Sequence, residues 1–419
     1  MPRSYSDWIE ACVEAQSDTE IPEEFKRWAA TSAVAGALGR RVWYDFGPFK
    51  VYPNMFVVLV GPPGGGKSLS LILPFDKIFS KLSTPIGTKR GSENFNCGLA
   101  SYGMEDDPLH LIADRITPEK LIVDMTRAYR PDLSMPSTAT GVPWGQSACT
   151  LLTSEFGAFM SRDDHYLQVS LTDLWDCRSE FTYRTKTAGE YIIKAPFLNW
   201  VAGATPHQLV ENLPENARSQ GLLSRMIIVY NEGGKRTEDI FYGSVDDFET
   251  GRLTKGLAEI AQLRGPFTIE PGFVAALRAE VQSGVEPRPT DANLAEYNQR
   301  RLSHLMKLAM VRAAARREDR KITQSDWEAA KEQLLAAEAS MPAALALFGQ
   351  KQAGRVSADL TAHLRETLIE GGKRAMSVTN FKREIMRRVN TPAEIEATFR
   401  AMQDAGIIKI EGGKVCLCA

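Results

Sequence analysis

The sequence predicts an α/β fold built on a parallel β-sheet, followed by a helical region and a small C-terminal domain. An apolar run at residues 55–60 leads through a glycine-rich turn into a helix start, the strand–loop–helix unit of a parallel sheet. Two more apolar runs, 148–153 and 197–204, are each followed by polar residues. Helical periodicity follows from 251 to 350, and residues 355–419 have the pattern of a separate unit.

The composition is that of an ordinary globular chain. Its 419 residues, 43% of them hydrophobic, can bury a sizeable core and predict two or three domains. With a net charge of −2, any contact with nucleic acid must come from local basic surface. The six cysteines form no C-x-x-C pair, which favours reduced thiols in a cytosol. No signal core or membrane-length apolar run is visible, so we expect a cytoplasmic protein without a membrane partner.

The glycine-rich turn is a phosphate-binding loop with the spacing G-x-x-x-x-G-K-S. Its three consecutive glycines permit backbone conformations closed to residues with a Cβ, so that N–H groups can wrap the β- and γ-phosphates of ATP. Lys67 is expected to reach the same phosphates, and the Ser68 hydroxyl to ligate Mg²⁺. The nucleotide-binding residues predicted from this loop are Gly61, Gly64, Gly65, Gly66, Lys67, Ser68 and Leu69.

The run at 148–153 is followed by an acid, Glu155. In NTPases with such a loop, the strand beside the loop strand brings a carboxylate near the γ-phosphate, where it polarises the attacking water. Glu155 is the predicted catalytic residue. Many such enzymes carry Asp-Glu, whereas Ser154 precedes the acid here, so Glu155 is expected to hold Mg²⁺ through water. A solvated acid at a strand end is the alternative interpretation.

Residues 181–195 predict a β-hairpin with a basic tip, on which Arg184 and Lys186 are candidate contacts to DNA. The next strand is buried and ends at Thr205, whose hydroxyl could hydrogen-bond the attacking water or the γ-phosphate.

Arg225 immediately precedes another core strand, at 226–230. A buried arginine needs a partner, and phosphate suits its planar donors. An ordinary salt bridge to a neighbouring acid remains open. Arg218 is the competing candidate for the phosphate contact.

The C-terminal part predicts a helical lid or bundle over 251–350, in which His304 is a packing or surface residue rather than a ligand. Three helices, starting near 356, 379 and 391, and a terminal two-stranded ribbon then give the pattern of a winged helix. Such domains bind duplex DNA or dock proteins, and both remain open. The candidate phosphate contacts here are Lys382, Arg383, Arg387, Arg388 and Arg400.

The order of these parts resembles an AAA+ ATPase core. It is most similar to the hairpin-bearing clade that includes minichromosome-maintenance and superfamily-three helicases, and to phage and mobile-element ATPases of the primase-helicase type. The resemblance covers roughly residues 20–340. The segments 52–56, 307–309 and 322–326 are especially like the phage-type proteins. The domains expected on this basis are an N-terminal helical and strand segment (1–50), a P-loop core (51–250), a helical lid (251–350) and a winged-helix-like domain (355–419).

The resemblance implies roles for the candidate residues. Lys67, Ser68 and Glu155 would act in the subunit that holds ATP, and Thr205 would be the sensor of the γ-phosphate. Arg225 would be an arginine finger supplied to the neighbouring subunit. The resemblance also implies that Arg301 is the second-sensor arginine and that Lys186 lies in the channel on the nucleic-acid backbone. Family members are usually rings, commonly homo-hexamers around single-stranded DNA.

Three functions are compatible with these predictions. The leading one is an ATP-driven DNA helicase or translocase of phage or mobile-element replication. The alternative, motivated by Ser154, is a nucleotide-switched helicase loader or remodelling factor with slow hydrolysis. A small-molecule kinase is the third, and the hairpin and C-terminal domain speak against it.

Overall fold

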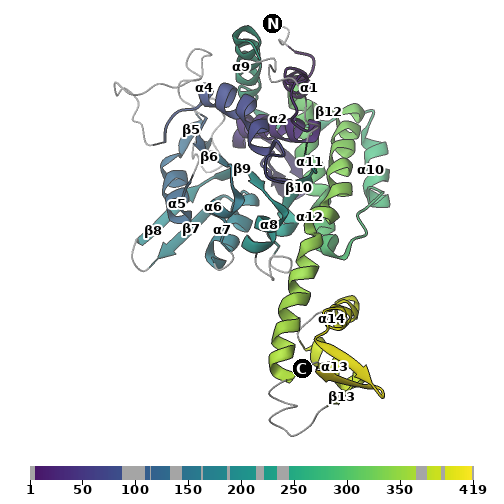
Figure 1. Ribbon diagram of the computed structural model, residues 1–419. Helices are drawn as coiled ribbons and strands as arrows, with labels where there is room; N and C mark the ends of the chain where they lie inside the picture. The colour runs from purple at the N-terminus through teal and green to yellow at the C-terminus, as the bar shows by residue number, and fades with distance from the viewer. Residues whose placement is uncertain are drawn as a thin grey trace. The chain divides into compact units, whose positions relative to one another are not determined.

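A computed structural model of the chain (Figure 1) describes most of its residues. It divides into two compact units, Met1–Ala344 and Leu345–Ala419. The described ranges are 5–86, 109–113, 115–132, 144–161, 164–185, 189–213, 221–233, 245–364, 375–387 and 392–417. No helix within these ranges is both long enough and apolar enough to cross a bilayer.

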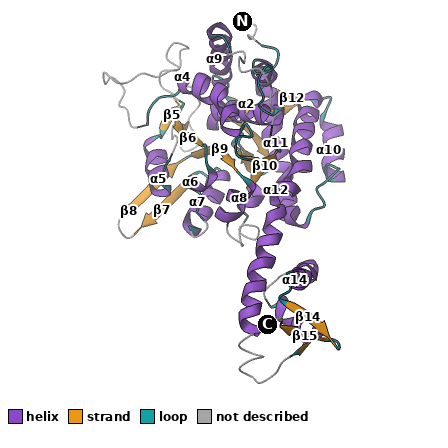
Figure 2. Cartoon of the chain, in the orientation of Figure 1, coloured by secondary structure: helices purple, strands orange, loops and turns teal. Residues whose placement is uncertain are grey.

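A parallel sheet forms the centre of the first unit, which confirms the predicted α/β class (Figure 2). Strands β3 and β9 are buried along their whole length, as their continuous apolar sequences require. Strand β5 (Arg130–Asp132) pairs antiparallel with β6. In spatial order, the parallel strands are β10 (Met226–Tyr230), β3 (Phe56–Val60), β9 (Pro196–Ala204), β6 (Trp144–Thr153) and β4 (Leu111–Ala113).

The strand order corrects one expectation. The strand that leads to Glu155 was expected to lie beside the loop strand, but β9 lies between β3 and β6. The register pairs Leu59 of β3 with Gly203, while Ala202 pairs with Thr153 of β6. Glu155 therefore lies at the same edge as the loop, displaced by one additional strand.

Helix α2 (Glu23–Leu38) packs on the sheet through small side chains. It contacts β3, β9 and β10, and also α1 (Trp8–Glu14), α9 (Asp247–Ala261) and α11 (Ala295–Arg316). Because it lies between the sheet and these helices, most of its side chains are buried. At Gly36 a Cβ atom would lie only 2.3 Å from Thr150 Oγ1, so a larger residue would push the helix off the sheet.

Shorter helices connect the strands. One of them starts at Thr117, whose side chain caps the helix by accepting a hydrogen bond from the Lys120 amide. The predicted hairpin is also present, as an antiparallel pair of strands. These elements are α5 (Pro118–Arg127), α6 (Phe156–Phe159), α7 (His165–Trp175), β7 (Glu180–Thr185), β8 (Gly189–Lys194) and α8 (Pro206–Asn212).

The region 251–350, predicted to be a helical lid or bundle, is not helical throughout, because part of it belongs to a second sheet. Two short strands interrupt its helices, and one of them, β11, pairs in parallel with β1 from the N-terminal segment. The segment at 265–269 is too short to show a period by itself, and its conformation depends on β1. In spatial order the strands are β12 (Lys321–Ile322), β11 (Gly265–Ile269), β1 (Val42–Phe46) and β2 (Phe49–Val51), and the helix after β11 is α10 (Val274–Ser283).

The first predicted helix of the C-terminal domain is instead the end of a longer helix. Helix α12 runs without a break over Gln324–Leu364, and the boundary between the two units falls within it. The sequence at 340–355 contains Pro342, Gly349 and Gly354, and the helix accommodates all three. The residues that follow, 365–374, lie outside the described part of the chain.

The second unit has a small apolar core under a three-stranded antiparallel sheet, where a two-stranded ribbon was predicted. The added strand, β13, has only two residues and pairs with β15. The core residues are Phe381, Ile385, Phe399, Met402, Ile408 and Val415. The elements are β13 (Met376–Ser377), α13 (Val378–Met386), α14 (Pro392–Asp404), β14 (Ile408–Glu411) and β15 (Lys414–Leu417).

Candidate nucleotide-binding site

The predicted phosphate loop connects β3 to α3 (Lys67–Leu71), and α3 continues into a π-helix, η2 (Ile72–Phe79). Gly64 has φ 74° and Gly66 has φ 85°, conformations that favour glycine. A Cβ atom on Gly66 would also lie 3.0 Å from Pro22 Cδ, at the start of α2. The loop therefore needs glycine for its backbone and for the close approach of α2.

Lys67 points back over its own loop. Its Nζ donates hydrogen bonds to the carbonyl oxygens of Gly61 (2.9 Å) and Pro62 (2.6 Å). Desolvation lowers the pKa of Lys67, and no carboxylate among the described residues contributes to the shift. A half-buried ammonium group that is matched only by carbonyl dipoles favours an incoming anion. The loop thus fits the triphosphate that its sequence predicts.

Three strand ends meet at this loop. The Gly61 amide donates to the Ala204 carbonyl at the end of β9 (3.1 Å). A Cβ on Gly203 would lie 2.6 Å from the Ser154 carbonyl oxygen and 3.8 Å from Lys67 Cβ, so β9 passes closely between the two. Lys67, the segment leading to Glu155, and the segment leading to Thr205 are therefore brought together. Ligands of open α/β sheets bind at this carboxyl edge.

Glu155 and Ser68 have exposed side chains at this edge. Glu155 is the N-cap residue of α6 and makes no capping hydrogen bond through its side chain. Thr205 begins α8 instead of ending a strand. Its Oγ1 accepts a hydrogen bond from the Gln208 amide, while the Gln208 side chain accepts one from the Thr205 amide. The Thr205 hydroxyl proton is not used in this capping box.

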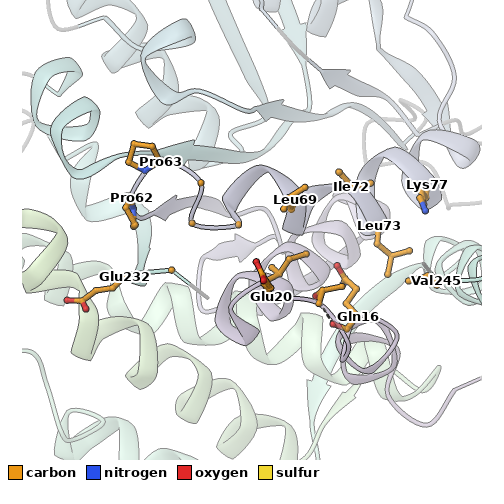
Figure 3. Close-up of a pocket in the computed structure, with 16 residues that line it drawn as sticks. Gln16, Glu20, Pro62, Pro63, Leu69, Ile72, Leu73, Lys77, Glu232 and Val245 are labelled. Atoms are coloured by element: carbon orange, nitrogen blue, oxygen red, sulfur yellow. Dashed lines mark hydrogen bonds between the residues drawn. The ribbon is translucent and has the colours of Figure 1, made fainter. Parts of the chain in front are cut away.

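The loop forms one wall of a cavity of about 440 Å³ (Figure 3). In this view the loop prolines lie at one end, and Lys77 and Val245 at the other. The opposite wall was not predicted, because no motif marks it. It comes from the connection between α1 and α2 and from the segments after β10, and its residues are Gln16, Thr19, Glu20, Ile21, Glu232, Gly233 and Val245.

Part of this unpredicted wall is held rigidly. The Gln16 side-chain amide donates to the Cys12 carbonyl (2.9 Å), and the Gln16 carbonyl accepts from Lys26 Nζ (2.7 Å). Apolar side chains of Ile21 and Leu73 line the cavity with it. Such a surface beside a phosphate loop can hold a base and ribose.

Arg225 lies at the other edge of the sheet. It precedes β10, whose five residues separate it from the loop edge by about 16 Å at the usual rise per residue. Its Nη2 donates to both Asp176 carboxylate oxygens (3.2 and 3.0 Å), and its Nη1 donates to the Gly221 carbonyl (2.9 Å). Within one chain, Arg225 therefore forms the salt bridge that the sequence left open, and its partner is Asp176. The competing Arg218 lies outside the described residues.

Arg301 is buried in the region predicted as the lid. Its Nε donates to Glu338 Oε1 (2.7 Å), and Tyr297 donates to the same oxygen (3.0 Å). It does not line the cavity beside the loop. A second-sensor role stays a prediction that would require Arg301 to leave Glu338. His304 packs between Trp175 and Tyr297, as predicted for a packing residue.

The candidate DNA contacts are described in part. Arg184 is exposed and forms a cross-strand pair with Glu190 (2.7 Å), while Lys186 lies outside the described residues, as does Arg388. In the second unit, Lys382 forms an ion pair with Glu396, and its ammonium lies over the Phe399 ring. The predicted contacts that stay exposed there are Arg383, Arg387 and Arg400.

No family model matches this sequence, and no curated protein matches it either. Among the described residues, no group of three or more His, Cys, Asp and Glu side chains gathers to hold a metal ion. In sites that bind Mg²⁺ with a nucleotide, water and phosphate oxygens supply most ligands, and for Ser68 and Glu155 a contact to Mg²⁺ stays a prediction.

Proposed function

We propose that the chain is an ATPase that hydrolyses Mg²⁺·ATP in the cavity beside residues 61–68. The observation that carries this proposal is the convergence of three strand ends around Lys67, a cation that has no carboxylate partner among the described residues. On binding, Lys67 would exchange its two carbonyl contacts for phosphate oxygens. The proposed cofactors are therefore ATP and Mg²⁺.

Two residues at the same edge would act on the attacking water. Glu155 would polarise it, since its side chain is exposed and directly follows Ser154, whose carbonyl lies against Gly203 at this edge. Thr205 would donate its free hydroxyl proton to the water or to a γ-phosphate oxygen. Mg²⁺, with Ser68 as its protein ligand, supplies charge neutralisation of the phosphates.

We further propose that this ATPase is a DNA helicase or translocase that works as an AAA+ ring, commonly a hexamer. The ring is proposed from the resemblance in the order of the parts, and a finger role for Arg225 toward a second copy would require this buried side chain to leave Asp176. The β7–β8 hairpin supplies the element expected to contact single-stranded DNA. The second unit, with its helices and three-stranded sheet, supports a winged-helix-like docking domain.

The test is steady-state ATP hydrolysis with and without single-stranded DNA, combined with unwinding of a forked duplex. We expect DNA to stimulate hydrolysis in the wild-type chain. Glu155→Gln should lower the rate at least about 100-fold while ATP binding is kept, since only the polarisation of water is lost. Glu328→Gln, an exposed acid on α12, is the control and should leave the rate unchanged.

Each outcome has a defined meaning. Absence of hydrolysis in the wild-type chain, or an unchanged rate in Glu155→Gln, would contradict the ATPase. Slow hydrolysis without unwinding would favour the loader or remodelling factor, for which the single acid after Ser154 is the supporting observation.

A further inference from the structure

A second cavity, of about 480 Å³, lies at the amino edge of the central sheet, away from the phosphate loop. We call it the amino-edge pocket. It brings together two segments that the sequence singled out, 52–56 and 307–309, because Lys307 Nζ donates to both the carbonyl (3.0 Å) and the side-chain oxygen (2.6 Å) of Asn54. Its lining includes Asn54, Trp175, Asp176, Arg178, Arg300 and Lys307.

The pocket has more positive than negative charge. Asp176 is the only carboxylate among the described residues that line it, and two guanidinium groups share this carboxylate. Arg225, behind the lining, lies 3.0 Å from it, and Arg300 lies 3.7 Å from it. Burial and then the charge of Arg225 lower the pKa of Arg300, although Asp176 opposes them. The geometry leaves Arg300 with an incomplete set of partners and an open side toward the cavity.

Lys307 adds a third cation. It is 3% exposed, and its ammonium group lies 3.9 Å from the centre of the Trp175 ring. Its hydrogen-bond partners are the two neutral oxygens of Asn54. Three cations, Arg225, Arg300 and Lys307, therefore lie near the single carboxylate of Asp176. The concave site has a surplus of two positive charges. A buried surplus of this kind is stabilised by an anion.

Aromatic side chains accompany these cations. The β1–β2 hairpin contributes Phe46 and Phe49 to the lining, and they are 40% and 70% exposed. Exposed phenylalanine rings beside guanidinium groups are the combination that proteins use to stack bases while neutralising phosphates. A simple inorganic anion would leave these rings unused.

We propose that the amino-edge pocket binds a nucleotide unit, with its phosphate toward Arg300 and Arg178 and its base against Phe46 and Phe49. A free nucleotide and a nucleotide within a single strand share this chemistry. The proposal does not depend on the ATPase function, since the two cavities lie at opposite edges of the sheet and share no lining residue.

The test is equilibrium dialysis of a radiolabelled, non-hydrolysable ATP analogue against the full chain. If the source is a free nucleotide, the wild-type chain binds two moles per mole. Lys67→Ala and the double variant Arg178→Ala/Arg300→Ala then each bind one. Arg278→Ala, an exposed arginine on α10, is the matched control and keeps two. Arg178 and Arg300 are substantially exposed, so the double variant should fold, which its thermal unfolding midpoint checks.

If the source is a strand, the wild-type chain binds one mole of analogue, which Lys67→Ala abolishes and the double substitution leaves in place, and a fluorescent oligothymidine becomes the probe. The oligothymidine then binds the Lys67→Ala protein, and adding Arg178→Ala/Arg300→Ala to that protein lowers the affinity at least ten-fold. Adding Arg278→Ala instead leaves the affinity unchanged. The proposal is overturned if neither probe responds to the double substitution, or if Arg278→Ala has the same effect. Full competition of either probe by equimolar inorganic phosphate would also overturn the nucleotide assignment.

Discussion

The two edges of the central sheet hold cations in opposite ways. At the carboxyl edge, Lys67 contacts only backbone carbonyls, and glycines open the backbone around it. At the amino edge, Arg225 and Arg300 share the carboxylate of Asp176. The first arrangement leaves a cation ready for a ligand, whereas the second balances part of its charge internally. A site built from backbone N–H groups is tied to a contiguous sequence, but a site built from side chains can draw on distant segments.

The largest effect is expected at the carboxyl edge. Lys67→Ala should lower ATP hydrolysis on the order of 10³-fold, because Lys67 is the cation of the phosphate loop and the one cation among the described residues lining the adjoining cavity, Lys77, lies at its far end. The measurement is phosphate release at saturating ATP. Lys81→Ala, an exposed lysine on the same run of helix, should leave the rate unchanged. Equal losses in both variants would mean that the effect is not specific to Lys67, and the proposed role of the carboxyl edge would fail.

At the amino edge, Asp176→Asn should remove the internal charge balance. Arg225 is 7% exposed and would lose its charged partner, which should lower the free energy of unfolding by about 3 kcal/mol. Denaturant unfolding measures this change, and added inorganic phosphate should restore part of it. Asp173→Asn, which removes the more exposed pair with Arg178, should cost less than about 1 kcal/mol. A small effect of Asp176→Asn would mean that the edge is not balanced by this carboxylate.

Gly203→Ala tests how closely the carboxyl edge is assembled. The added Cβ would stand 2.6 Å from the Ser154 carbonyl, so β6 and Glu155 must shift. We expect a loss of about 2 kcal/mol in the free energy of unfolding and a reduced hydrolysis rate. The control is Gly251→Ala in α9, where nothing lies within 4 Å and a helix former should stabilise by up to about 1 kcal/mol. Unchanged stability in Gly203→Ala would show that the strand ends are less tightly packed.

The smallest effect concerns pH at the amino edge. Burial lowers the pKa of Lys307 to about 8, with Arg225 and Arg300 acting in the same direction and Cys177 and Asp176 against it. The unfolded chain then binds more protons than the folded chain between pH 8 and about 10.5, so stability rises with pH in that window. From pH 8 to 9 the gain should be about 1 kcal/mol. Lys307→Met should flatten this dependence, and an identical slope in the variant would contradict it.

The sequence by itself determined the local features. The loop at 61–68, the cap at Thr117 and the β7–β8 hairpin follow from adjacent residues, because glycine conformations, N-caps and strand alternation act within a few positions. The parallel sheet was also predictable, since its buried strands are continuous apolar runs.

The tertiary structure alone decided which distant segments meet. It inserted β9 between β3 and β6, placed the connection at 16–21 opposite the loop, and paired β11 with β1. It also chose Asp176, 49 positions away, as the partner of Arg225. These outcomes depend on crossover connections and on competition among many possible partners, and no local pattern records which partner the folded chain selects.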